Sequence, residues 1–105
     1  MRWVPTEPWL NWMARRVADG RLVATVQATV RCEQAWVAWV VGAEFQGRGF
    51  GREAAAGMTD WLARNGIRQL RAAIAPGHAH SETLARSVGM APTEETVDGE
   101  RVWAG

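Results

Sequence analysis

The residues best suited to chemistry lie in one glycine-rich stretch, QGRGFGR at positions 46–52. It follows an apolar run at 35–41 and opens a helical pattern that continues to about residue 65. The first amides of a helix lack intrahelical acceptors, and the helix dipole adds partial positive charge there. Glycines let an anion approach the backbone closely, and Arg48 and Arg52 add cations beside it. The stretch therefore predicts a pyrophosphate site.

The spacing of the glycines narrows the choice of ligand. A nucleoside-triphosphate loop ends in Gly-Lys-Ser/Thr, and this chain contains no lysine. The dinucleotide fingerprint has two residues between its second and third glycines, whereas Gly47, Gly49 and Gly51 alternate with other residues. Neither of these nucleotide-binding motifs fits.

The stretch resembles the acetyl-CoA signature of the GNAT acetyltransferases, Gln/Arg-x-x-Gly-x-Gly/Ala. Gln46, Gly49 and Gly51 match it position by position. The resemblance covers roughly residues 9–105 and is closest to the branch that includes the ribosomal-protein N-terminal acetyltransferases. It implies an N-acetyltransferase that moves the acetyl group of acetyl-CoA to a primary amine by direct attack.

A second block, residues 74–90, resembles the family's second cofactor segment, in which Asn-x-x-Ser leads a helix that ends in Gly-Phe. Ser81, Gly89 and Met90 keep that spacing, and His78 takes the place of the asparagine. The resemblance implies that Ser81 hydrogen-bonds the leaving thiolate, although a serine at this place is as commonly a helix N-cap.

The resemblance also implies where the cofactor lies. The strand before the glycine turn would splay from its parallel neighbour, and pantetheine would lie in the V between them. The backbone around Val41 would bind the pantetheine, and the glycine turn would bind the pyrophosphate. The residues that the resemblance assigns to the cofactor are Val41, Gln46, Gly47, Arg48, Gly49, Gly51, Arg52, His78 and Ser81.

Other candidate groups are weaker. Many family members use a tyrosine as the acid, and this chain has none. Glu33 and Glu44 flank the central strand and are candidates for a base, although glutamates at such places are more commonly solvated. Two histidines without nearby cysteines or carboxylates make a poor zinc site, so no metal is expected. His80 is expected to be a loop or cap residue.

Length and composition favour one domain over residues 1–105. The formal net charge is +1 and no basic block points to nucleic acid, nor does a long apolar run point to a membrane. The N-terminus lacks the apolar region of a signal peptide, and the single cysteine, Cys32, excludes an internal disulfide. A cytoplasmic protein is expected.

Periodicity and turn residues predict an α+β domain on a mixed sheet. Strands are expected at 9–17, 22–30, 36–41 and 69–75, helices from the glycine turn to 65 and at 81–88, and a C-terminal hairpin at 96–102. Asp-Gly pairs mark the turns at 19–20 and 98–99. The order resembles that of the GNAT family, and by this resemblance the family's first strand and two helices are expected to be missing.

Seven tryptophans in so short a chain are unusual. Trp9 and Trp12 fall on what would be an edge strand, so a second subunit is expected to cover it, giving a homodimer. Three hypotheses follow: an acetyltransferase with a small-molecule or peptide amine as acceptor, a CoA-binding module without turnover, and a tryptophan-rich assembly protein in which the glycine turn is structural.

Overall fold

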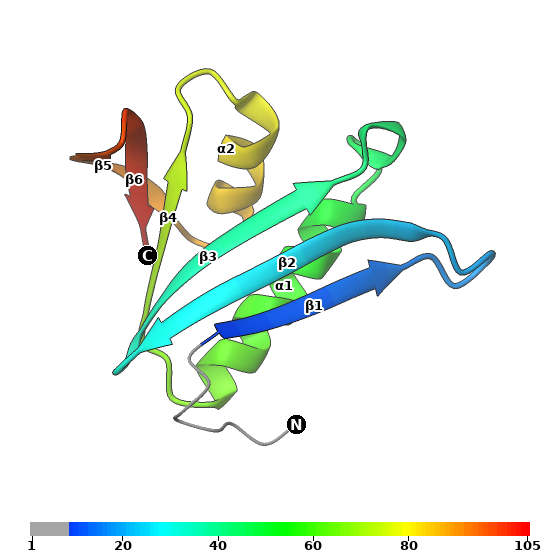
Figure 1. Ribbon diagram of the computed structural model, residues 1–105, viewed down its shortest axis with the longest axis horizontal. Coiled ribbons are helices and arrows are strands. Elements are labelled where there is room, and N and C mark those ends of the chain that lie inside the picture. The colour runs from blue at the N-terminus through cyan, green and yellow to red at the C-terminus, as the bar shows by residue number, and fades with distance from the viewer. Residues whose placement is uncertain (1–8) are drawn as a thin grey trace.

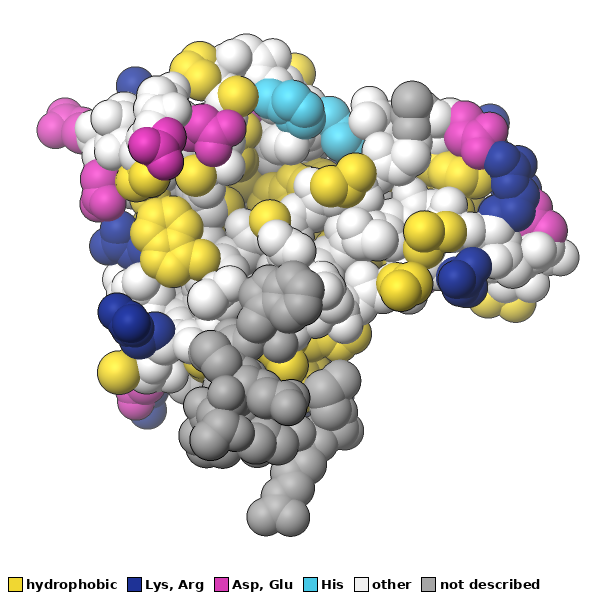
Figure 2. All heavy atoms as spheres, in the orientation of Figure 1, with side chains coloured by type: hydrophobic (Ala, Val, Ile, Leu, Met, Phe, Trp, Pro, Cys, Tyr) yellow, Lys and Arg dark blue, Asp and Glu magenta, His cyan; other side chains and the backbone are white. Residues whose placement is uncertain are grey.

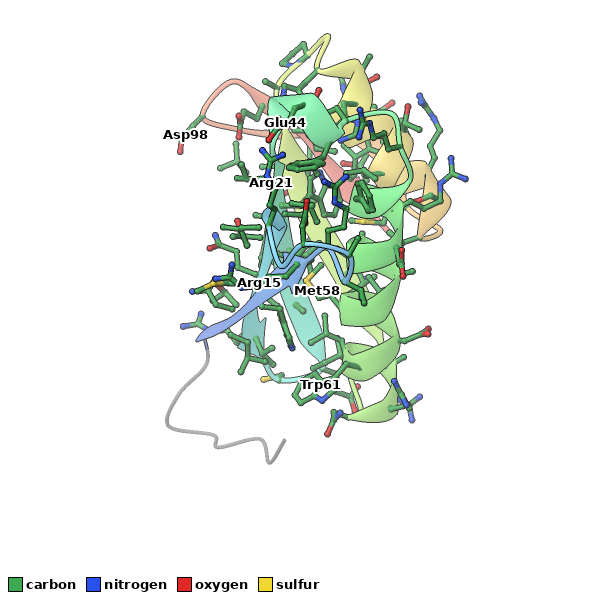
Figure 3. All side chains as sticks on the ribbon, turned by 90° about the vertical axis from the view of Figure 1, so that its right-hand side faces the viewer. Arg15, Arg21, Glu44, Met58, Trp61 and Asp98 are labelled. Carbon is green, nitrogen blue, oxygen red and sulfur yellow. The ribbon has the colours of Figure 1, made fainter. Side chains whose placement is uncertain are left out.

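The computed structural model describes residues 9–105, which form a six-stranded sheet with both helices on one face (Figures 1 and 3). The expected α+β class and element order are confirmed. The elements are β1 (Trp9–Arg15), β2 (Leu22–Arg31), β3 (Gln34–Val41), the 3₁₀ turn η1 (Ala43–Phe45), α1 (Phe50–Arg64), β4 (Gln69–Ile74), α2 (Ala79–Ser87), β5 (Ala91–Val97) and β6 (Glu100–Ala104).

The sheet is mixed, with strand order β1-β2-β3-β4-β6-β5. Strands β1, β2 and β3 form an antiparallel meander, and β6 pairs antiparallel with both β4 and β5. The β3–β4 pair is parallel, because α1 carries the chain back across the sheet before β4 begins. As expected, β1 is an edge strand.

The parallel pair is short. β3 and β4 pair only where residues 34–36 meet residues 69–71. Beyond Trp36 the two strands diverge, so that the C-terminal half of β3 stands apart from β4 (Figure 1). The V that the resemblance implied is therefore present, and it opens towards the glycine turn.

The core lies between the sheet and the helices. On α1, Ala55, Met58 and Leu62 are buried, and on α2 Leu84 and Ala85 are buried, as helical spacing predicts. Met58, Leu62 and Ala85 pack against inward residues of the strands, which include Val26, Ala28, Ala35, Val37, Ala72 and Ile74. Leu84 packs in a second cluster with Val23, Ala24, Val41 and Phe45.

Tryptophan covers the edge of this core within the chain itself. Trp12 of β1 packs edge to face on Trp61 of α1, with ring centroids 5.6 Å apart. Trp39 also packs on the helix side, whereas Trp36 alternates to the other face. The side chain of Trp12 is thus half-buried within the chain itself, and the second subunit expected along β1 stays a prediction.

Some boundaries differ from the prediction. β1 ends at Arg15 rather than Val17, because residues 16–21 form a longer loop than a two-residue turn. The Arg16 amide donates to the Arg21 carbonyl at 2.8 Å, the Gly20 amide donates to the Arg16 carbonyl at 2.7 Å, and Val17 is fully exposed. β5 starts at Ala91, earlier than the predicted residue 96.

The irregular lead-in expected at residues 1–8 lies outside the described residues. Within residues 9–105, neither helix is long and apolar enough to cross a membrane.

Candidate functional site

The glycine turn leads into backbone amides that have no acceptor among the described residues. Gly47 and Gly49 have φ angles of 79° and 85°, a region that glycine enters without the Cβ penalty. Gly49 is the N-cap of α1, and its carbonyl accepts a hydrogen bond from the Glu53 amide at 3.0 Å. In the described part of the chain, no acceptor engages the three amides of residues 50–52. They are available to an anion.

Gly51 brings three elements together. It is buried, and a Cβ at this position would lie 2.8 Å from Val41 Cγ2 of β3 and 3.2 Å from Leu84 Cδ1 of α2. A glycine is needed here for close packing rather than for an unusual backbone angle. The start of α1 is thereby held against both the splayed end of β3 and the helix α2.

A small pocket of about 100 Å³ opens at this junction. It is lined by Gly47, Gly49, Gly51, Arg52, His80, Thr83 and Leu84. The pocket unites the two sequence blocks that were assigned to the cofactor, since the first four residues come from the glycine turn and the last three from α2.

His80 is the functional candidate that sequence reasoning missed. Its Nε2 is buried and has no hydrogen-bond partner among the described residues, and the side chain lines the pocket. An unpaired buried nitrogen is costly, so a ligand group that pairs with it would relieve that cost. The spacing of His80, Thr83 and Leu84, i, i+3 and i+4 on one helical face, was the available signal.

The residue that caps the N-terminus of α2 differs from the predicted one. His78 is the N-cap, and its Nδ1 accepts a hydrogen bond from the Ser81 amide at 3.4 Å. Ser81 is the third residue of α2 and is half-buried, so it is not the N-cap. The cap predicted for His80 or Ser81 is therefore supplied by His78. Both histidines lie beside a recess between the diverging strands (Figure 2).

The remaining motif residues lie around the turn. Gln46 donates from Nε2 to the Val41 carbonyl at 3.3 Å, which ties the turn to the end of β3. That carbonyl is thus already engaged at the place where the resemblance implied a pantetheine contact. Arg48 and Arg52 are both exposed, but only Arg52 lines the pocket.

Comparison with known protein families identifies the family of this chain. The family described as the acetyltransferase (GNAT) domain matches residues 2–91. The chain belongs to the GNAT family. No curated protein matches it in sequence.

Solved structures share this GNAT fold at low sequence identity. The ribosomal-protein-S5-alanine acetyltransferase of Vibrio fischeri superposes with a TM-score of 0.77 at 18% identity, over 95% of this chain and 62% of its own. The F149A mutant of the spermidine N-acetyltransferase SpeG of Vibrio cholerae superposes with a TM-score of 0.75 at 14% identity, over 95% of this chain and 65% of its own. RimJ of Mycobacterium smegmatis, solved in complex with CoA-disulfide, superposes with a TM-score of 0.71 at 21% identity, over 83% of this chain and 48% of its own. The GNAT chain thus spans less than two thirds of the length of these relatives.

Neither of the two carboxylates considered as bases lines the pocket of this GNAT domain. Glu33 precedes the paired end of β3, opposite the splayed end, and its carboxylate lies 3.8 Å from Arg68. Glu44 lies in η1, and its carboxylate pairs with Arg21 (Figure 3). Within residues 9–105, no group of three His, Cys, Asp or Glu side chains is placed to hold a metal ion.

Proposed function

We propose that this GNAT chain binds acetyl-CoA and transfers its acetyl group to a primary amine. The observation that carries the proposal is the position of the glycine pocket at the open end of the β3–β4 V. A ligand with an anionic end and a long, amide-containing arm fits this arrangement, because the pocket offers cationic and N–H groups and the diverging strands offer unpaired backbone.

The residues of the pocket suit a pyrophosphate. The amides of residues 50–52 have no acceptor among the described residues, and Arg52 adds a guanidinium. His80 adds a buried nitrogen without a partner. The resemblance also assigned Gln46, Arg48 and His78 to the cofactor. In the structure Gln46 shapes the turn and His78 orders the first turn of α2, so we propose indirect roles for both.

Acetyl-CoA supplies an acetyl thioester that an uncharged amine can attack. The chain's task is then to hold the thioester still, polarise its carbonyl and stabilise the departing thiolate. We assign the last role to the Ser81 hydroxyl, which can donate a hydrogen bond to sulfur. The backbone amide of Ser81 donates to Nδ1 of the His78 cap, which orders the first turn of α2.

The acceptor is proposed only as a class, a primary amine on a small molecule or a peptide. The solved relatives include an enzyme named for an alanine of a ribosomal protein and one named for spermidine. Both acceptors are amines, and we propose that the pocket residues described above bind the cofactor rather than the acceptor.

A CoA-binding module without turnover is the second candidate. It is favoured by the absence of tyrosine from the sequence, which removes the acid that many family members use. The two candidates share the pocket and differ only in chemistry, so a binding assay tests both and a turnover assay separates them.

The first test is thermal unfolding with acetyl-CoA, with ATP and NADH as controls. Ligand at a hundred times its dissociation constant is expected to stabilise the fold by about 2.7 kcal/mol, a shift of several degrees. A shift with acetyl-CoA alone supports the proposal. No shift with acetyl-CoA, or an equal shift with all three ligands, would contradict it.

We also propose that a second copy pairs along the β1 edge. Among residues 9–105 no strand pairs with the outer side of β1, and Met13 on this strand is 66% exposed. Sedimentation at micromolar concentration is expected to show a dimer, and Met13→Glu is expected to shift it towards monomer. A monomeric parent protein would refute this assembly.

A further inference from the structure

The loop of the β1–β2 hairpin contacts the segment that leads into the glycine turn. Arg16 and Arg21 of this loop place their guanidinium groups over the ring of Phe45, at 5.4 and 5.2 Å from its centre. Both distances fall within the reach of a cation–π contact, about 6 Å. Phe45 ends η1, and the next residue, Gln46, begins the glycine-rich stretch. The hairpin therefore contacts the chain directly beside the proposed cofactor site.

Phe45 is also held from within the sheet. Its side chain is only 3% exposed, and its amide donates to the Gly42 carbonyl at 2.8 Å. The Gly42 amide donates in turn to the Val23 carbonyl of β2, at 2.9 Å. A Cβ at Gly42 would lie 3.2 Å from Cδ2 of the Phe45 ring. The backbone of η1 is thus tied to β2, and the aromatic ring has little room to move.

The same ring closes the glycine turn at its base. Phe45 packs edge to face against Phe50, the first residue of α1, with ring centroids 5.7 Å apart. Between these two residues lie only positions 46–49, where Gly47 and Gly49 adopt positive φ angles. Because one aromatic pair fixes both ends of this short segment, a displacement of Phe45 would move the turn and the first amides of α1.

Two carboxylates hold the arginines in place. Arg16 donates to Asp19 through Nε and Nη2, and Asp19 also accepts from the Arg21 amide at 3.1 Å. The Arg21 guanidinium pairs with Glu44 of η1 (Figure 3). Each cation thus has a carboxylate beside it, which reduces the repulsion between two positive charges that share one ring.

From these contacts we infer that Arg16 and Arg21 are positioning residues for the cofactor site and act through Phe45. They hold its ring against Phe50, and so set where the glycine turn and the amides of residues 50–52 lie. This positioning role rests on the proposed binding of acetyl-CoA. Neither arginine lines the glycine pocket, so their effect on the cofactor is indirect.

The test is calorimetric titration of acetyl-CoA into Arg21→Gln, which removes the cation from the Phe45 ring. The dissociation constant is expected to rise about two- to fivefold, the size of a partly exposed cation–π contact. Arg15→Gln is the matched control, because it removes a guanidinium of the same hairpin that donates to the Gly20 carbonyl instead. It is expected to leave the affinity unchanged.

Ile67→Val separates positioning from a general loss of stability. Ile67 packs on the core beyond the C-terminal end of α1, so this substitution is expected to destabilise the fold and to leave the affinity unchanged. All titrations are run at a temperature at which thermal unfolding shows each variant to be folded.

Hydrogen exchange without ligand gives a second readout at the turn itself. The amides of Phe45 and Glu53 are hydrogen-bonded on either side of the turn, to Gly42 and Gly49. Both amides are expected to exchange faster in Arg21→Gln than in either control variant.

A double-mutant cycle tests whether the effect passes through Phe45. In a Phe45→Leu background, Arg21→Gln is expected to cause no further loss of affinity, because the ring that transmits the effect is gone. Additive effects of the two substitutions would overturn the inference.

Three further results would also overturn it. They are an unchanged affinity in Arg21→Gln, an equal loss of affinity in Ile67→Val, and unchanged exchange at the two amides. Each of these leaves the proposed acetyl transfer standing, since the parent protein still binds acetyl-CoA. A parent that does not bind acetyl-CoA contradicts the proposed function and the positioning role with it, so the two failures are distinguished by the parent protein alone.

Discussion

Gly51 at the start of α1 lies so close to Val41 at the end of β3 that no methyl group fits between them. A Cβ on Gly51 would be 2.8 Å from Val41 Cγ2 and 3.2 Å from Leu84 Cδ1. Gly57, on the same helix, has no neighbouring atom within 4 Å of the corresponding point. The two glycines therefore have different reasons to be there, and only the first is set by packing.

Gly51→Ala is expected to lower the free energy of unfolding by about 1–3 kcal/mol, because the added methyl overpacks a junction of three elements. Gly57→Ala, on an exposed turn of α1, is expected to raise it by about 0.5–1 kcal/mol, through reduced entropy of the unfolded chain. Urea denaturation measures both. Equal effects of the two substitutions would show that the contact with Val41 is not tight.

Arg52→Ala is expected to raise the dissociation constant of acetyl-CoA about tenfold, since a charge-assisted contact to phosphate is lost. Arg64→Ala, at the far end of the same helix, is the control and is expected to leave affinity unchanged. The difference between the two variants is expected to shrink at high salt, because Arg52 is exposed. An unchanged affinity in Arg52→Ala would remove this arginine from the pyrophosphate site.

Ser81→Ala is expected to lower kcat by about 10- to 100-fold while the affinity for acetyl-CoA stays within a factor of two or so, if the hydroxyl stabilises the thiolate. Ser87→Ala, in the last turn of α2, is the matched control. A steady-state assay with a thiol-reactive reagent reports kcat, and calorimetry reports affinity. A variant that binds and turns over like the parent would exclude Ser81 from the chemistry.

The pH dependence of stability is expected to carry a contribution from the hairpin. Hydrogen bonds from the Arg16 guanidinium, and then from the Arg21 amide, lower the pKa of Asp19 from 3.8 to about 2. Because the folded-state pKa is lowered, the contribution is complete above pH 3.8 and is lost as the pH falls through about 2.

Asp19→Asn is therefore expected to unfold at a lower temperature than the parent near neutral pH and to show a shallower fall in stability over that acid window. Asp60→Asn, an exposed position on α1, is the control. The effect is expected to be small because Asp19 is at the surface. Parallel curves for the parent and Asp19→Asn would contradict the hairpin contribution.

The order of elements and the glycine turn could be predicted from the sequence because they depend on residues close together in the chain. Alternating apolar residues marked the strands, Asp-Gly pairs marked the hairpins, and the glycines marked the start of α1. The inward faces of both helices also followed from spacing alone, since Met58, Leu62, Leu84 and Ala85 are all buried.

What escaped prediction depends on tertiary packing. Helical spacing groups His80 with Thr83 and Leu84, but only tertiary packing brings that face of α2 to the same pocket as the glycine turn. The partner of Trp12 likewise comes from α1, far away in the chain. Predicted boundaries were wrong where a side-chain cap, rather than a turn residue, determines the end of an element. The cap formed by His78 starts α2 at Ala79 instead of the predicted Ser81.

The short β3–β4 pairing has a consequence for how the molecule assembles. Each half of the sheet is held by antiparallel pairing, but the halves are joined in the sheet by three residue pairs from segments that the whole of α1 separates. Joining such distant segments costs loop-closure entropy, so this seam is expected to form late in folding. Hydrogen exchange is then expected to be faster at residues 69–71 than at the centre of β2, so this seam is expected to be the first part of the sheet to open.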